Sequence, residues 1–137
     1  MKFIFEDLDV WKIAVDFTEK VYVVSKDFPK DEKYGITSQL RRASLSISLN
    51  IAEGKGRYSN KEFRQFLLIA RGSLYETITL LKICLRLGYI KDTQQNDLIK
   101  DCEKIQSKLG GLLNYLKTAS RPTACSLDPT AVPVSRE

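Results

Sequence analysis

Apolar residues recur every three to four positions along most of the chain, which is the period of an amphipathic α-helix. The pattern divides into four stretches, over residues 7–26, 36–54, 60–87 and 93–117. The apolar rows are Val10, Ala14, Phe17, Val21 and Val24; then Ile36, Leu40, Ala43, Ile47 and Ile51; then Phe63, Leu67, Ala70, Leu74, Ile78, Leu81 and Leu85; and finally Leu98, Cys102, Ile105, Leu109, Leu112 and Leu116. No alternating run of useful length indicates a strand. The sequence therefore predicts an all-α protein, an antiparallel up-down four-helix bundle.

Polar residues mark where two of these helices begin. Asp7 or Asp9 is placed to cap the first helix. Ser59, followed three residues later by Glu62, forms a capping box ahead of the third helix. We therefore expect side-chain caps at both starts.

Proline and glycine mark the helix ends. Phe28–Pro29 closes the first helix, because a residue before proline avoids the α conformation. Gly54 and Gly56 are expected to terminate the second helix, and Gly88 the third. Gly110–Gly111 lies inside the fourth helix, where glycine costs about 1 kcal/mol relative to alanine. We expect this pair to mark a tight helix crossing.

The first helix carries a second apolar row of Trp11, Val15 and Tyr22 beside the first. Two adjacent rows make a wider stripe than one neighbouring helix covers, so we expect part of it to lie in a subunit interface. The predicted assembly is a homo-oligomer of a single domain over residues 1–117. Residues 118–137 hold three of the four prolines and no helical period, and we interpret them as a flexible C-terminal tail.

Positive charge is concentrated in the middle of the chain. Residues 41–91 carry ten Lys/Arg and three Asp/Glu, within a chain of net charge +5. Such an excess favours phosphate-rich partners. The candidate nucleic-acid-binding residues are Arg41, Arg42, Lys55, Arg57, Lys61, Arg64 and Arg71, with Lys82 and Arg86 further along the same segment. Lys61, Arg64 and Arg71 share one helix face by their spacing. The alternative is that this is an ordinary solvated face.

Residues that carry catalysis are scarce. The chain has no histidine, and its three cysteines, Cys84, Cys102 and Cys125, are scattered without zinc-site spacing. No nucleophile motif, phosphate-binding loop or dinucleotide fingerprint occurs. We therefore expect no enzymatic activity, no metal and no cofactor, with Cys84 and Cys102 as core thiols. No stretch has the length and apolarity of a membrane span or signal peptide, which predicts a cytoplasmic protein.

Several polar and small residues lie where a plain bundle does not need them. Asn50 and Glu53 are one turn apart on the second helix, and Gly72–Ser73 interrupts the third. One interpretation is a buried hydrogen-bond network with a close-packing glycine. The other is a groove or a subunit contact that these residues shape. Glu76, one turn beyond Gly72, could approach Glu53 across neighbouring helices.

A family resemblance rests on two strings. Residues 28–57 read FPKDEKYGITSQLRRASLSISLNIAEGKGR and residues 66–76 read FLLIARGSLYE. They resemble the four-helix-bundle family named after intervening sequences in 23S ribosomal RNA genes, over about residues 8–117. The residues that match its pattern are Phe28, Pro29, Glu32, Tyr34, Gly35, Gln39, Leu40, Arg42, Ala43, Ser46, Ile47, Asn50, Ile51, Ala52, Glu53, Gly54, Arg57, Gly72, Ser73 and Glu76. Ser48 departs from it, since the family usually has proline there.

The resemblance implies a homopentameric bundle without established enzymatic activity. The chain is also similar to the accessory variability proteins of diversity-generating retroelements, which bind a reverse transcriptase and nucleic acid. Our leading hypothesis is a basic oligomeric adaptor that binds RNA or DNA, as an accessory to a reverse transcriptase. The rival is a structural or protein-interaction bundle without nucleic-acid binding. A catalytic bundle would need a metal or cofactor.

Overall fold

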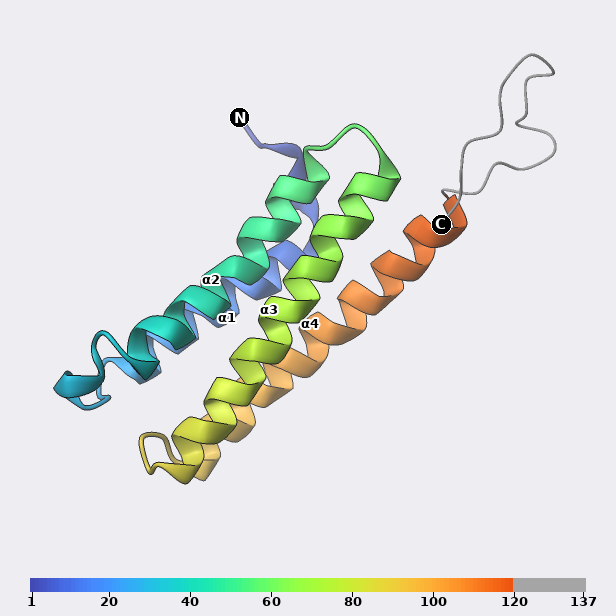
Figure 1. The fold of residues 1–137 in the computed structure, drawn as a ribbon. Helices are drawn as coiled ribbons and strands as arrows, with labels where there is room; N and C mark the ends of the chain where they lie inside the picture. Colours follow the sequence, from blue (N-terminus) through green and yellow to red (C-terminus); the bar gives the residue numbers. More distant parts are fainter. Residues whose placement is uncertain (120–137) are drawn as a thin grey trace, which may run out of the picture.

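The computed structural model describes residues 1–119, which form four α-helices, two short 3₁₀ turns and no strand (Figure 1). The helices are α1 (Asp9–Ser25), α2 (Ile36–Lys55), α3 (Asn60–Arg86) and α4 (Asp92–Ala119), and the turns are η1 (Ile4–Asp7) and η2 (Lys30–Glu32). The prediction of an all-α, four-helix protein is confirmed. Helix α4 extends to Ala119, so the expected bundle boundary at 117 falls inside the helix. The rest of the expected tail lies outside the described residues.

Each helix packs against two others. Helix α2 contacts α1 and α3, α4 contacts α1 and α3, and the α2–α3 pair has the most extensive contact. In Figure 1, α1 (blue) lies behind α2 (teal), while α3 (green) lies between α2 and α4 (orange). The apolar rows meet in one core, whose largest fully buried side chains include Phe17, Leu40, Ile47, Leu67, Leu74, Leu81, Ile105 and Leu109. Burial of these rows is the main force that holds the helices together.

The two ends of α3 follow the sequence signals. The Ser59 hydroxyl accepts a hydrogen bond of 3.1 Å from the backbone N–H of Glu62, which confirms the predicted N-cap. At the other end Gly88 has φ of +78°, a conformation that glycine adopts without strain. It allows the N–H of Tyr89 to reach the Cys84 carbonyl at 2.9 Å. Gly88 is therefore the terminator that was predicted.

The start of α1 differs from the prediction, because neither aspartate caps it. Leu8 occupies the N-cap position, and no side chain bonds to the first free N–H groups there. Both carboxylates bind lysines instead: Asp7 pairs with Lys2 at 3.3 Å and Asp9 with Lys108 at 3.7 Å. The prediction of a side-chain cap at α1 was therefore wrong.

Two predictions about glycines were wrong. Helix α2 continues through Gly54 to Lys55 and ends at Gly56, so Gly54 is a buried helical residue rather than a terminator. Gly110–Gly111 does not mark a close crossing, because a Cβ at either position would have no neighbour within 4 Å. The neighbouring helices pass α4 too far away to require glycine there.

The second apolar row of α1 is only partly exposed. The Trp11 ring packs edge-on against Phe5 of η1 with 5.1 Å between ring centroids, which covers part of that row. Val15 remains 39% exposed, and Tyr22 is half-buried. Ion pairs join α1 to α4, from Lys20 to Asp101 at 2.9 Å and to Asp97 at 3.3 Å. None of the described helices is long and apolar enough to cross a membrane.

Candidate nucleic-acid interface

A chain of hydroxyl and amide groups links α2 to α3. The Asn50 Nδ2 group donates to the carbonyl of Ser46 at 2.8 Å and to its Oγ at 2.9 Å. The Ser73 hydroxyl, on α3, donates to the same Ser46 Oγ at 2.8 Å. These groups are partly buried, where an unmade hydrogen bond would be costly. The predicted hydrogen-bond network is confirmed for Asn50 and Ser73, but Glu53 is not part of it.

The close-packing glycine is Gly54 rather than Gly72. A Cβ at Gly54 would lie 2.6 Å from Cβ of Phe66 and 3.0 Å from Cδ1 of Phe63. At Gly72 a Cβ would have nothing within 4 Å, and α3 runs unbroken through this residue. The glycine that lets α2 and α3 approach is therefore on the other helix and nearer the connecting turn.

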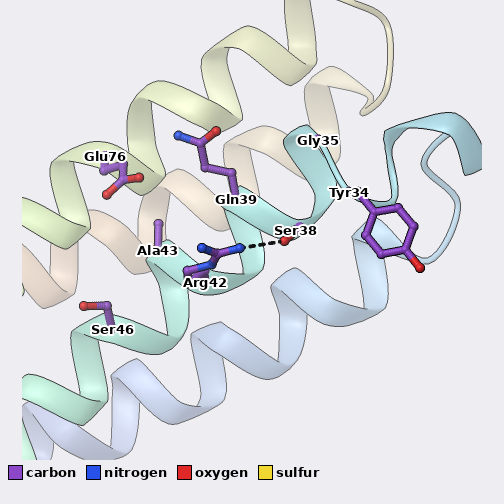
Figure 2. A pocket seen from close by; sticks show the side chains of 8 residues that line it. All are labelled: Tyr34, Gly35, Ser38, Gln39, Arg42, Ala43, Ser46 and Glu76. Atoms are coloured by element: carbon purple, nitrogen blue, oxygen red, sulfur yellow. Dashed lines mark hydrogen bonds between the residues drawn. The ribbon is translucent and has the colours of Figure 1, made fainter.

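Gln39, Arg42 and Glu76 line a pocket of about 400 Å³ beside the start of α2. Figure 2 shows Gln39 and Arg42 on α2 and Glu76 reaching in from α3. Arg42 donates from Nη2 to the Ser38 hydroxyl at 3.1 Å. Glu76 makes no hydrogen bond or ion pair within residues 1–119. Glu53 does not line this pocket, and no contact joins the two glutamates within residues 1–119, because Glu53 pairs with Arg57 near the other end of α2.

Glu53 instead binds Arg57 at the end of α2. The Arg57 Nη2 atom lies 2.7 Å from Glu53 Oε2, and the guanidinium stacks on the Phe66 ring at 4.7 Å from its centroid. Both charged side chains are substantially exposed, so the pair adds only about 0.3–0.5 kcal/mol. Lys55 lies over the Phe63 ring at 5.5 Å in the same way. The aromatic residues at the start of α3 thus hold the two cations at the end of α2.

Arg41 faces α1 rather than the outside of the α2–α3 pair. Its Nε donates to the Ser25 hydroxyl at 2.8 Å, and its guanidinium lies 4.6 Å from the centroid of the Tyr22 ring. These contacts give Arg41 a structural role between two helices. We therefore leave Arg41 out of the candidate interface.

The remaining cations lie along α3. Lys61, Arg64, Arg71, Lys82 and Arg86 make up a set that we call the α3 basic row. Arg64 and Arg71 are seven residues apart, which places them about 20° apart around the helix. Arg71, Lys82 and Arg86 have no hydrogen bond or ion pair in the described part of the chain, and the Nε of Arg64 is buried without a partner. Compensating carboxylates are few, since α2 and α3 carry eight Lys/Arg and three Asp/Glu.

Tyr75 lies on the same helix face as the α3 basic row, and the sequence analysis missed it. It is 45% exposed and lies four residues after Arg71 and seven before Lys82. Its hydroxyl accepts a hydrogen bond of 3.3 Å from Nε2 of Gln106 on α4. The spacing alone could have revealed it, because four- and seven-residue steps keep a residue on the same helix face.

Comparison with protein families tests the family resemblance of residues 28–57 and 66–76. The model of the family described as "23S rRNA-intervening sequence protein" matches residues 6–111, most of the described chain. The chain belongs to the 23S rRNA-intervening sequence protein family. Ser48, where proline is usual for the family, lies inside an uninterrupted α2 and donates to the Leu45 carbonyl at 3.4 Å. The family fold therefore forms here without a proline at this position.

A solved structure of similar fold comes from Bacteroides thetaiotaomicron. It is described as a protein of unknown function from the S23 ribosomal protein family, and is 24% identical to this chain with a TM-score of 0.71. The match covers 77% of this chain and 95% of that one. At this identity the likeness establishes the fold alone. No curated protein matches the chain.

Proposed function

We propose that this protein is a non-enzymatic, basic, oligomeric adaptor that binds RNA or DNA through the α3 basic row. In this proposal the four helices form an antiparallel up-down unit, and five copies assemble as a homopentamer in the cytoplasm without a metal or cofactor. The resemblance to accessory variability proteins of diversity-generating retroelements adds a reverse transcriptase as a second partner.

The observation that carries the proposal is the set of unpaired cations on α3. Arg71, Lys82 and Arg86 extend over about four turns of helix without a carboxylate partner in residues 1–119. A helix that carries more cations than acids, and several of whose cations form no ion pairs, offers favourable electrostatic energy to a polyanion. The family's link to ribosomal RNA genes, carried by its name, is consistent with an RNA ligand.

The test is a titration of labelled single-stranded RNA and DNA at increasing salt concentrations. Each phosphate contact adds roughly 0.7–0.9 to the slope of log affinity against log salt. Replacing Arg71, Lys82 and Arg86 together by Gln should therefore lower that slope by about 2–3.

A matched control removes the same charge elsewhere. Lys12, Lys100 and Lys104 are exposed lysines of α1 and α4, and their replacement by Gln should leave the slope within about 1 of the parent value. Absence of binding at low salt, or equal effects of the two triple variants, would rule the α3 basic row out as the interface.

The rival function, a structural or protein-interaction bundle, is favoured by a different observation. Leu45 and Leu49 on α2 and Ile69 on α3 are 37%, 63% and 53% exposed. Exposed large apolar residues mark protein contacts where they form a contiguous patch. This function predicts a stable oligomer without salt-dependent nucleic-acid binding, and a Leu49→Asp variant that dissociates it. Co-purification with a co-expressed reverse transcriptase tests the second partner of the leading proposal.

A further inference from the structure

A groove of about 510 Å³ runs between α3 and α4, beside the middle of the α3 basic row. Arg71 and Tyr75 form its α3 side, and Glu103, Gln106 and Asn114 lie on the α4 side. The volume falls within the range of small-molecule sites in proteins, about 300–1,000 Å³. The groove is open to solvent along its length, so a ligand attached to a longer chain could enter it.

Two glycines of α4 keep this groove hollow. Gly110 and Gly111 line it, and a Cβ at either position would meet no atom within 4 Å. Packing of α4 within the subunit therefore does not require them. Each lowers the helix propensity of α4 relative to alanine. The space they leave belongs to the groove rather than to the core.

The groups around this space combine three kinds of chemistry. The Tyr75 ring is 45% exposed, and its hydroxyl is held by Gln106, so the ring has a defined orientation. Arg71 is half-buried and has no hydrogen bond or ion pair within residues 1–119. The Glu103 carboxylate, which only accepts hydrogen bonds when ionised, has no partner among the described residues. A planar ligand with an anionic group and N–H donors matches all three.

We propose that the groove binds one unstacked nucleobase of a single-stranded nucleic acid. The base stacks on the Tyr75 ring, the adjacent phosphate binds Arg71, and the donor edge of the base bonds to Glu103. Guanine fits best, because its N1–H and N2–H groups can both donate to one carboxylate. Uracil fits worst, because it offers a single N–H between two carbonyls. This inference rests on the proposed function, since it concerns the same α3 surface.

The experiment measures fluorescence anisotropy of labelled single-stranded RNA of about twelve nucleotides, with oligouridine compared with the same strand carrying central guanines. Tyr75→Ala should weaken binding of the guanine strand about fivefold to a hundredfold, the range that loss of one stacked base produces. Tyr75→Phe keeps the ring and should bind within about twofold of the parent protein. Tyr115→Ala removes a tyrosine 66% exposed on α4 that does not line the groove, and it is the matched control.

A second variant separates base recognition from general affinity. Glu103→Gln should abolish the preference for guanine over uracil while leaving oligouridine affinity equal or higher, because a negative charge is removed. DNA strands of the same sequence should show the same preference, because the inferred contacts are to base and phosphate.

The outcomes distinguish failure of nucleic-acid binding as a whole from failure of base binding in the groove. If the parent protein binds neither strand at low salt, the proposed function itself fails. If binding is salt-dependent but unaffected by Tyr75→Ala and Glu103→Gln, only the groove proposal fails. If Tyr75→Ala instead changes the molecular mass measured by light scattering, the groove is covered by another copy of the chain, and the nucleobase inference is overturned.

Discussion

Tyr89 and Glu32 join two connections of the bundle through a hydrogen bond of 2.8 Å from the Tyr89 hydroxyl to Oε2 of Glu32. The other carboxylate oxygen accepts from the backbone N–H of Ile36 at 3.4 Å, in the first turn of α2. The Phe28 ring packs against Tyr89 with 5.7 Å between centroids. One carboxylate thus holds the α1–α2 connection, the start of α2 and the α3–α4 connection together.

Tyr89→Phe keeps the aromatic packing and removes the hydrogen bond to Glu32, and it should lower the free energy of unfolding measurably. Urea denaturation monitored by circular dichroism measures the change. Tyr34→Phe is the matched control, because Tyr34 is 88% exposed and should change stability by less than about 0.5 kcal/mol. Equal losses in the two variants would contradict the assigned role of Tyr89.

The same hydrogen bond makes stability depend on pH in the alkaline range. The pKa of Tyr89 is raised above its ordinary value of 10.0. The largest cause is the hydrogen bond to the Glu32 carboxylate, and the next is desolvation of the hydroxyl. The unfolded chain therefore loses this proton first as pH rises. The stability that Tyr89 contributes is complete below pH 10 and is lost as pH rises through the folded-state pKa. The gap in urea midpoint between the parent protein and Tyr89→Phe should accordingly shrink above pH 10. A gap that stays constant would refute the linkage.

Gly54→Ala should destabilise the protein by about 1–3 kcal/mol, because the new methyl group overlaps Phe66 and Phe63 at the α2–α3 contact. Gly72→Ala enters open space inside a helix and should be neutral or stabilising by up to about 1 kcal/mol. Thermal and urea unfolding of the two variants side by side provide the measurement. The opposite order of stability would show that the α2–α3 approach does not depend on Gly54.

The two core thiols should be chemically inert in the native protein. Burial raises the pKa of Cys84 to about 11 and that of Cys102 to about 12, so almost no thiolate is present near neutral pH. In a Cys125→Ser variant, labelling by a disulfide reagent should be about a hundredfold slower in the folded than in the urea-unfolded protein. Rapid labelling under native conditions would mean that the core opens readily.

The fold could be predicted where the signals are local. The apolar rows determine which helix faces are buried, and Ser59 and Gly88 act through backbone groups a few residues away. The roles of Gly54 and Gly72 could not be assigned in this way. Whether a glycine touches a neighbour depends on the distance to another helix, which sequence spacing does not contain.

The candidate site was harder to predict for the same reason. Arg41 and Arg71 look alike in sequence, but one binds Ser25 and the Tyr22 ring across a helix contact and the other has no partner in the described chain. Partner choice among long side chains is decided by tertiary packing. Residue type and spacing indicated a basic segment correctly, but not which of its cations remain available.

The ion pairs between α1 and α4 have a consequence at long range. Lys20 and Lys108 neutralise carboxylates locally, and together α1 and α4 carry six Lys/Arg and seven Asp/Glu. The excess of cations on α2 and α3 therefore gives the subunit an electric dipole directed across the bundle. In the field of a distant polyanion the subunit experiences a torque that turns α2 and α3 toward the polyanion. Its orientation is selected during diffusion, before any atom of the two molecules touches.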